Sequence, residues 1–395
     1  MPDRKRLLIL SGSFPDIRCG VSRHTDIISR LTAQQSDYEV HVLTSDEPAV
    51  DPGIAQQYQV HPRIRKWGPC HCADLCREIL RLKPDIVHIQ NPTVKYNGWR
   101  SLTMSVLAPL LKRQAPTVRL VVTQHDIALS RKLLRRRFRP LFRAADAVLV
   151  SNHRDYQAVR DQKINPAKIY CSPVGSHLIL PARTPAAKAA ARTAMDIPQQ
   201  KICVAYFGFV HPGRRIDVLV RALHLLRAEN YDIHGLIMGG AYAGQKNYYR
   251  QCQQLAQQLQ LAEHITWTGY ADEKQIIDGL IASDAFVSLP DRGADMRNTS
   301  IHSAILAELP VVTTRNPRYY EDPDLEKLGC VCVAGDDPTA VAEGIRGTLK
   351  NPPPAESLAH RRKQLDPEAI WTRHIEVNIS AYRGEPPTPP GFLLM

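Results

Sequence analysis

The sequence predicts an α/β protein of two domains, each built on a parallel β-sheet. A chain of 395 residues is longer than one ordinary α/β core and suits two domains of similar size. Short β-rich runs alternate with helix-length amphipathic segments along most of the chain, which favours parallel βαβ units. The alternation stops over residues 181–200 and then restarts, which indicates a connection between two domains.

The N-terminal domain is expected over residues 1–180. Its strands are predicted at Leu7–Leu10, Glu39–Leu43, Ile86–Ile89, Val118–Val122 and Ala147–Val150. The helices between them are predicted at Val21–Leu31, Ala73–Leu82, Trp99–Arg113 and Arg131–Arg143. The linker that follows, residues 181–200, holds Pro181, Pro185 and Pro198 with an alanine-rich charged stretch and has no strand pattern.

The C-terminal domain is expected over residues 201–365, followed by a terminal helix at 366–384 and a proline-rich tail at 385–395. Its strands are predicted at Ile202–Phe207, His234–Met238, His264–Trp267, Ala285–Leu289, Pro310–Thr313 and, at an edge, Cys330–Val333. Its helices are predicted at Asp217–Arg227, Tyr248–Leu259, Glu273–Ile281, Ser300–Leu306 and Thr339–Leu349.

The composition of the chain indicates which kinds of binding partner and which cellular compartment to expect. Fifty-one Lys and Arg residues against 39 Asp and Glu give a net charge of +12, which favours nucleotide phosphates, acidic lipid surfaces or nucleic acid. Nine cysteines without framework spacing favour reduced thiols and a cytoplasmic protein. The aliphatic run Leu7–Leu10 is too short for the core of a signal peptide and is better explained as a buried strand.

Ligands of parallel α/β sheets bind at the carboxyl ends of the strands, so we expect the chemistry in the loops that follow strands. In the first domain, Gly20 starts a helix whose backbone amides could approach an anion, and His125 directly follows a buried strand. Each feature also has a purely structural explanation. A Gly-x-Gly-x-x-Gly fingerprint and a Walker lysine loop are absent here, which argues against dehydrogenases and NTPases.

Two loops of the second domain carry charged candidates. Arg214 and Arg215 follow a strand and suit a diphosphate, because guanidinium groups match phosphate oxygens, although a solvated basic turn is the alternative. In the later loop, Asp295 could accept hydrogen bonds from sugar hydroxyls and Arg297 could hold a phosphate. The amides of Asn298, Thr299 and Ser300 would add a helix N-terminus, or Thr299 or Ser300 would only cap the helix.

These loops and their neighbours resemble the retaining glycosyltransferases of family four. The matching segments are Gly20–Thr25, Pro84–His88, Thr123–Asp126, Ala145–Ser151, Pro173–Gly175, Phe207–Phe209, Trp267–Tyr270, Leu309–Thr313 and the terminal helix at Trp371. The resemblance covers nearly the whole chain. It implies the GT-B fold, in which two Rossmann-like domains face a central cleft.

The resemblance also implies roles for single residues. Amides near Gly20 and the side chain of Arg214 would meet the donor diphosphate, His125 would lie beside the reacting sugar, and Asp295 would grip the donor. Family members carry two glutamates where this chain has Asp295 and Ser303, and an arginine where it has Phe209. A serine cannot hold a ribose as a carboxylate does, and Arg215 and Arg297 could supply the missing positive charge.

The predicted function is transfer of a sugar from a nucleotide-sugar donor to a hydroxyl acceptor with retention of anomeric configuration, in polysaccharide, glycolipid or glycoconjugate biosynthesis. The nucleotide sugar is a co-substrate, and neither a metal nor another cofactor is expected, because cationic side chains and helix amides can stabilise the leaving diphosphate. Two alternatives stay open: a non-catalytic interaction protein derived from such an enzyme, and a nucleotide-sugar epimerase of the same architecture.

Two further patterns have functional and structural explanations. The segment Arg131–Arg143 interleaves arginines with leucine and phenylalanine, so it could hold the enzyme against an anionic membrane and a lipid-linked acceptor, or be a solvated helix. Nucleic acid is not expected, because no recognition module accompanies the arginines. Cys70, His71, Cys72 and Cys76 look metal-like, but their spacing fits no common zinc site and favours a structural role.

Overall fold

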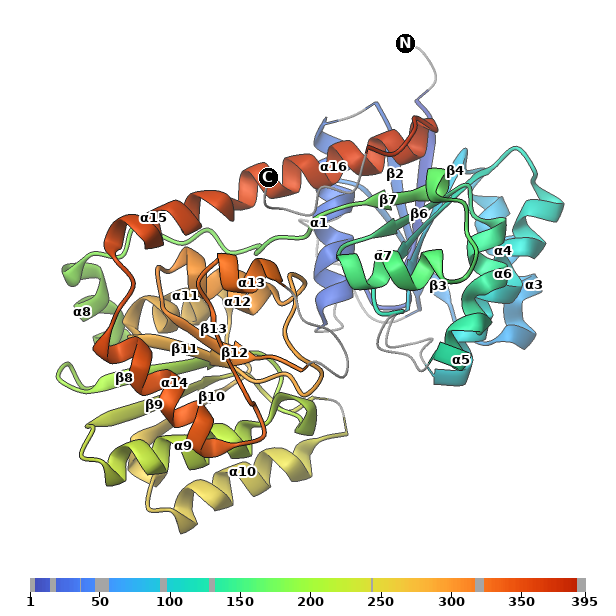
Figure 1. Ribbon diagram of the computed structural model, residues 1–395. Coiled ribbons are helices and arrows are strands. Elements are labelled where there is room, and N and C mark those ends of the chain that lie inside the picture. The colour runs from blue at the N-terminus through green and yellow to red at the C-terminus, as the bar shows by residue number, and fades with distance from the viewer. Residues whose placement is uncertain are drawn as a thin grey trace. The chain divides into compact units, whose positions relative to one another are not determined.

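The computed structural model describes residues 4–14, 19–35, 37–46, 57–92, 98–127, 132–242, 244–316 and 323–388. Within these residues the chain forms two compact units (Figure 1). The first unit comprises residues up to Pro173 together with the segment from Trp371 onward, and the second comprises Val174–Ile370. The end of the chain therefore completes the N-terminal unit.

The first unit is built on a parallel sheet with the strand order β3-β2-β1-β4-β5-β6-β7. The strands are β1 (Arg6–Leu10), β2 (Glu39–Ser45), β3 (Gln59–Ile64), β4 (Ile86–Asn91), β5 (Arg119–Gln124), β6 (Ala147–Val150) and β7 (Ile169–Cys171). The order reverses direction between β1 and β4, which is the switch point of a doubly wound sheet, where the loops after neighbouring strands diverge and leave room for ligands.

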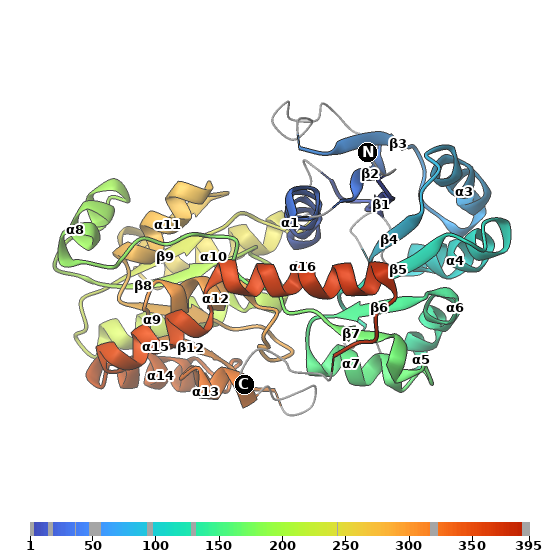
Figure 2. The same ribbon diagram turned by 90° about the horizontal axis from the view of Figure 1, so that it is seen from above.

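Helices cover both faces of this sheet. They are α1 (Gly20–Gln35), α3 (Cys72–Arg81), α4 (Leu102–Gln114), α5 (Lys132–Arg135), α6 (Arg139–Ala144), α7 (His153–Arg160) and α16 (Pro367–Arg383), with short 3-10 helices η1 (Pro69–His71), η3 (Gly98–Ser101), η4 (Arg136–Phe138) and η5 (Pro166–Lys168). Figure 2 shows α1 and α16 on one side of the sheet and α3 and α4 on the other.

The sequence of β1 explains this two-sided burial. Successive side chains of a strand point to opposite faces. Leu8 and Leu10 therefore join the core under α3, α4, α6 and α7, whereas Leu7 and Ile9 join the core under α1 and α16. All four side chains are fully buried. A continuous aliphatic run is what a strand covered by helices on both faces requires.

The predicted strands of this unit are confirmed, but the sequence analysis missed β3 and β7. β3 lies at the sheet edge, is largely exposed and contains Pro62, so it has no apolar pattern. β7 is three residues long. Both strands form because a neighbouring strand offers unpaired backbone groups, a tertiary cause that no local pattern reports.

The prediction of one continuous helix over Arg131–Arg143 is wrong. Arg131 lies outside the described residues, and the rest folds as α5, η4 and α6 in succession. Pro140 occupies the first turn of α6, where a residue without a backbone N–H is tolerated, and this favours the start of a new helix at Arg139. The apolar residues Phe138, Leu141 and Phe142 are buried, as the pattern predicted, while Arg136 and Arg143 are exposed.

The second unit has a parallel sheet with the order β10-β9-β8-β11-β12-β13. Its strands are β8 (Ile202–Phe207), β9 (Ile233–Met238), β10 (Ile265–Gly269), β11 (Ala285–Ser288), β12 (Val311–Thr314) and β13 (Val331–Val333). Its helices are α8 (Pro185–Ala194), η6 (Pro212–Arg214), α9 (Ile216–Ala228), α10 (Lys246–Gln258), η7 (Ala262–His264), α11 (Glu273–Ala282), α12 (Thr299–Leu306), α13 (Pro323–Lys327), α14 (Pro338–Lys350) and α15 (Ala355–Gln364).

The segment 181–200, expected as a linker, contains helix α8 and belongs to the second unit. Thr184 caps this helix by accepting a hydrogen bond from the amide of Ala187, and Pro185 occupies its first turn. Arg192, 4% exposed, fixes the helix by donating to the carbonyl of Ala282 at 3.0 Å and to the carboxylate of Asp284 at 2.6 Å. The segment is therefore part of a folded unit.

Candidate functional site

His125 lies at the carboxyl end of β5, beside the switch point of the first sheet. Its backbone N–H donates to the carbonyl of Asn91 at 2.8 Å, which holds the residue against the end of β4. The imidazole is half-buried, and its Nε2 lies 2.8 Å from Oε1 of Gln90. An amide oxygen only accepts, so Nε2 of His125 carries the proton. The tautomer of His125 is thus set by a neighbouring strand.

Behind Gln90 a chain of uncharged groups runs through the core. The Gln90 amide nitrogen lies 3.4 Å from Nε2 of His88, which also accepts from the hydroxyl of Thr123 at 2.7 Å. Nδ1 of His88 lies 2.8 Å from the hydroxyl of Tyr382 on α16. Burial lowers the pKa of His88 to about 3, assisted by the nearby His374 and His125. The chain is therefore neutral at ordinary pH.

A second pair of histidines lies beside His125. The ring of His24, from α1, packs edge-on against His125 with centroids 5.1 Å apart. Nε2 of His24 is 3.2 Å from Nε2 of His374, from α16. The Nδ1–H of His374 donates to the carbonyl of Pro173 at 2.7 Å, so its Nε2 is the acceptor and His24 is the donor. Residues 350 positions apart in the sequence thus form one buried contact.

Both of these rings are uncharged as well. Burial is the largest cause that lowers the pKa of His374 to about 4. Burial, and then the neighbouring histidines His374, His125 and His88, hold the pKa of His24 well below its usual range. Nδ1 of His24 is buried and, among the described residues, has no hydrogen-bond partner. We call His24, His88, His125 and His374 the histidine network.

Gly20 is the first residue of α1. It is exposed, and a Cβ placed on it would meet no atom within 4 Å among the described residues. Packing therefore does not demand glycine at this position. The open space agrees with the predicted approach of a ligand to the helix N-terminus, and that approach stays a prediction.

In the second unit, the loop after β8 and the loop after β11 lie side by side. The amide of Asp291 donates to the carbonyl of Gly213 at 3.0 Å. Arg214 ends η6, and Arg215 begins α9 in a left-handed conformation with φ of 51°. His211 lies near Asp291 and Arg214, and burial, together with the charge of Arg214, lowers its pKa to about 4. The turn that holds Arg214 and Arg215 thus lies next to the loop after β11.

Asp295 and Arg297 are paired with each other. The guanidinium of Arg297 binds the carboxylate of Asp295 through two contacts, Nη2 to Oδ2 at 2.9 Å and Nε to Oδ1 at 3.1 Å. The backbone amide of Arg297 donates to the same carboxylate at 2.9 Å. Asp295 is 2% exposed. The sequence analysis treated the two side chains as independent ligands, and their bidentate pairing comes from the tight turn that joins them.

Asn298, Thr299 and Ser300 form the start of α12, directly after this turn. The side-chain oxygen of Asn298 accepts from the amide of Asp295 at 2.9 Å, and its carbonyl accepts from the amide of Ile301 at 2.8 Å. The three residues are half-buried. The turn therefore fixes the position of the N-terminus of α12, and the predicted contact of these amides with an anion stays a prediction.

Ser303 lies one turn further along α12 and is buried. Its hydroxyl donates to the carbonyl of Thr299 at 2.9 Å and lies 2.8 Å from the hydroxyl of Ser176. Next to it, His302 is fully buried, its pKa is lowered to about 4 by burial, and neither ring nitrogen has a hydrogen-bond partner among the described residues. Ser303 thus connects α12 to the start of the second unit.

The sequence analysis missed His24, His88 and His374. A weak signal existed for His88, because His88 and Gln90 are two residues apart on a strand and share one face. His24 lies in the first turns of α1, where the helical period alone did not set it apart. No local pattern connects either residue with His374.

The cysteine-rich segment has a packing role. The thiol of Cys72 lies 3.3 Å from the carbonyl of Thr103, and that of Cys76 lies 3.2 Å from Oε1 of Gln114. Both side chains belong to the core, and burial raises the pKa of Cys72 to about 11. Within the described part of the chain, no group of three or more His, Cys, Asp or Glu side chains could hold a metal ion.

Two family models match successive parts of the chain. A model of the family described as Glycosyltransferase Family 4 matches residues 19–178, and a model of Glycosyl transferases group 1 matches residues 188–365. A comparison with curated proteins gives no match. Of the helices in the described residues, none has the length and apolarity to cross a membrane.

Solved structures of glycosyltransferases share the fold at low sequence identity. Sucrose-phosphate synthase of Thermosynechococcus elongatus superposes with a TM-score of 0.73 at 17% identity, over 97% of this chain and 100% of that one. HepE of Anabaena, in complex with UDP and glucose, gives 0.70 at 15% identity, over 96% and 97%. WaaG, a glycosyltransferase involved in lipopolysaccharide biosynthesis, gives 0.64 at 15% identity, over 94% and 99%.

The two family models follow one another along the chain and together account for most of it. The two parallel sheets, of orders 3-2-1-4-5-6-7 and 10-9-8-11-12-13, are those of the GT-B fold that these structures share. The chain belongs to the glycosyltransferases of family four and group one.

Proposed function

We propose that the protein transfers a glycosyl group from a nucleotide-sugar donor to a hydroxyl acceptor, with retention of anomeric configuration. The observation that carries this proposal is the meeting of the loops after β8 and β11, which brings the turn that holds Arg214 and Arg215 beside the start of the loop that leads into α12. Cationic side chains and helix amides are suited to a leaving diphosphate, because its negative charge grows as the glycosidic bond breaks. No cofactor besides the nucleotide sugar is proposed.

Asp295 is proposed to act on the donor through Arg297. Its carboxylate is buried and bound to the guanidinium, so it fixes the position of Arg297. Arg297 is the more exposed partner, with 15% of its side chain accessible against 3% for Asp295. A guanidinium whose position is fixed beforehand loses little entropy when it binds a phosphate.

His125 is proposed to assist the reaction through its imidazole. Its Nε2–H donates to Gln90, so its Nδ1 is the ring atom that can accept a hydrogen bond from a sugar hydroxyl. The histidine network holds the ring from two sides. A group held in this way contributes most in the transition state, where its contact with developing charge strengthens.

The acceptor is proposed to be lipid-linked, with the exposed arginines of the segment 132–143 against the cytoplasmic face of a membrane. This proposal rests on the exposed Arg136 and Arg143 and on the likeness to WaaG, whose description names lipopolysaccharide biosynthesis. Sedimentation with anionic and with neutral vesicles tests it: binding should need the anionic lipid and should be reversed by salt.

A thermal-shift screen across UDP-, GDP-, ADP- and dTDP-sugars tests the transferase proposal, since ligand binding raises the Tm by mass action. We expect one nucleotide series to raise it. Arg214→Ala should weaken binding of that donor by about 1.5–3 kcal/mol, the range for charged hydrogen bonds. The exposed Arg221, on α9 of the same unit, provides the control variant Arg221→Ala.

The stereochemistry is tested by NMR of the anomeric proton in the first product formed. An α-linked donor should give an α-linked product. Inversion would contradict the proposed retention and leave glycosyl transfer intact. A donor that binds but is neither transferred nor hydrolysed would favour the non-catalytic relative, which the serine at position 303 makes the main alternative. A changed sugar configuration without acceptor would indicate the epimerase.

A further inference from the structure

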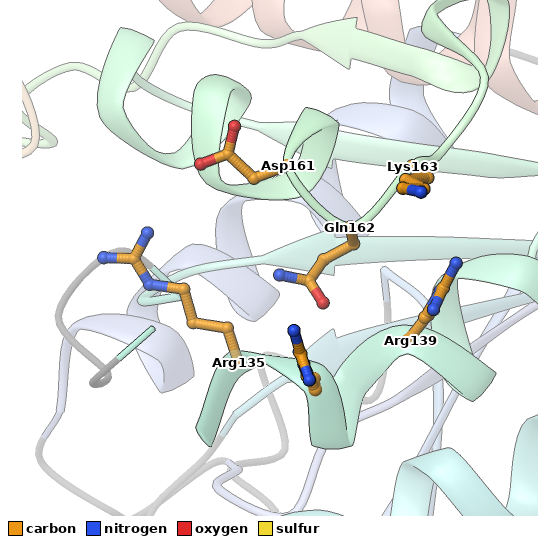
Figure 3. Close-up of a pocket in the computed structure, with 6 residues that line it drawn as sticks. Arg135, Arg139, Asp161, Gln162 and Lys163 are labelled. Carbon is orange, nitrogen blue, oxygen red and sulfur yellow. The ribbon is translucent and has the colours of Figure 1, made fainter. Parts of the chain in front are cut away.

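The first unit contains a basic pocket that is not part of the donor site proposed in the second unit. Its cavity of about 420 Å³ is lined by the helical segment α5–η4–α6 and by the turn that follows α7 (Figure 3). The lining residues are Arg135, Arg136, Arg139, Asp161, Gln162 and Lys163. We call this the arginine pocket.

The arginine pocket carries a large positive charge. Four cationic side chains and one carboxylate line it, which gives a formal charge of +3. The one carboxylate, Asp161, accepts a hydrogen bond from the side-chain amide of Gln157 on its own helix at 2.9 Å. Figure 3 shows the carboxyl group of Asp161 pointing away from Arg139. Within the described residues, Arg136, Arg139 and Lys163 form no ion pair.

This arrangement costs stability when the pocket is empty. Arg136 and Arg139 are three residues apart on successive helical turns, a spacing at which like charges repel. Nε of Arg139 is buried and has no hydrogen-bond partner among the described residues, and a buried donor without a partner is costly. An anion in the pocket would offset the repulsion between the two arginines.

The shape and chemistry of the pocket select the anion. Guanidinium groups bind phosphate oxygens in pairs, and a phosphomonoester offers three such oxygens and up to two charges. The volume lies within the range of small-molecule sites, so it can hold more than a bare ion. The lining has no aromatic ring on which a base could stack, whereas the Gln162 amide could bind a hydroxyl or ester oxygen.

We propose that the arginine pocket binds a phosphomonoester group, carried either by a lipid headgroup or by a small soluble molecule. Arg136, Arg139 and Lys163 hold the phosphate oxygens, and Gln162 contacts the group to which the phosphate is attached. This site lies within the first unit and does not depend on the proposed transferase activity, whose phosphate ligands are in the second unit.

Isothermal titration calorimetry with inorganic phosphate, at constant ionic strength, tests the site. The double variant Arg136→Gln/Arg139→Gln should bind phosphate at least about tenfold more weakly than the wild type. Arg113→Gln removes an exposed charge from α4, outside the pocket, and should bind like the wild type. Arg214→Gln should keep this binding event while losing the response to the donor nucleotide, which separates the two proposals.

Vesicles distinguish the two sources of phosphate. Phosphatidic acid presents a phosphomonoester, and phosphatidylserine presents a diester with a carboxylate, so vesicles of equal surface charge differ in the group that the pocket recognises. A lipid source predicts tighter sedimentation with phosphatidic acid, lost in the double variant and kept in Arg113→Gln. A soluble source predicts the calorimetric difference without a preference between the two lipids.

Two results would overturn the proposal. One is phosphate binding that is equal in the wild type and in the double variant. The other is a lower Tm of the double variant without any phosphate-dependent change, because the cations would then only complement the C-terminal end of α7. The proposal predicts the opposite: without phosphate the double variant is at least as stable as the wild type, and phosphate raises only the Tm of the wild type.

Discussion

In the first unit the side chains around His125 are buried and uncharged, whereas in the second unit the loop after β11 depends on a buried ion pair. The histidine network is held by hydrogen bonds among imidazole rings, amides and hydroxyls. Asp295 and Arg297 are held by opposite charges at 2.9 Å. The two sets of candidate residues are therefore held in place by different interactions, hydrogen bonds around His125 and an ion pair at Asp295. Each kind of interaction should respond to a different change in the protein or the solution.

The largest effect is expected from breaking the ion pair. Arg297→Ala should lower the free energy of unfolding by about 3–5 kcal/mol, because it leaves the charge of the buried Asp295 without its partner. Urea unfolding followed by tryptophan fluorescence measures it. Adding Asp295→Asn should recover part of the loss, and Arg221→Ala serves as the exposed control. A loss below about 1 kcal/mol would mean that the pair behaves like a surface salt bridge.

The next effect concerns His125 and appears in turnover. His125→Ala should lower kcat about 100-fold and change the donor KM little, because its contact strengthens as charge develops. Steady-state kinetics with the donor found in the thermal-shift screen measures it. His153→Ala, an exposed histidine at the start of α7, is the matched control. An unchanged kcat would return His125 to a structural role.

A smaller effect is expected in the pH dependence of stability, through the buried His374. The pKa of His374 is about 4 in the folded protein and about 6.5 in an unfolded chain. Below pH 6.5 the unfolded state therefore binds more protons, so stability falls as the pH falls and levels off near the folded pKa. Between pH 6.5 and 4.5 one such histidine accounts for about 2 kcal/mol.

His374→Gln tests this account, because glutamine keeps a donor for Pro173 and an acceptor for His24 but does not titrate in this range. Its unfolding free energy should decline by about 2 kcal/mol less than that of the wild type over the same interval. Parallel pH profiles of the two proteins would contradict a neutral, buried His374. Arg297→Lys should not change the slope, since neither cation titrates there.

The smallest effect is expected at Ser303. Ser303→Ala removes the hydrogen bond to Ser176 and the bond to the carbonyl of Thr299, and should cost about 0.5–1.5 kcal/mol. Thermal unfolding measures it, and Ser300→Ala provides a half-buried control on the same helix. A much larger loss would show that Ser303 organises the turn at Asp295 as well.

The sequence by itself determined the α/β class, the alternation of strands and helices and the positions of His125, Arg214 and Arg297 after strands. These features follow from local causes: a buried parallel strand needs an aliphatic run, and an amphipathic helix needs a 3.6-residue period. The terminal helix was also visible, because Ile370, Trp371 and Ile375 recur at helical spacing.

Tertiary structure alone decided the histidine network, the burial of the Asp295–Arg297 pair and the arginine pocket. His24 and His374 are 350 residues apart in the sequence and meet only because α16 packs against the same core as α1. Arg136 and Lys163 line one cavity because α6 and α7 cover one face of the sheet. Burial then sets the charge state of these groups, and burial depends on the whole fold, which no short stretch of sequence contains.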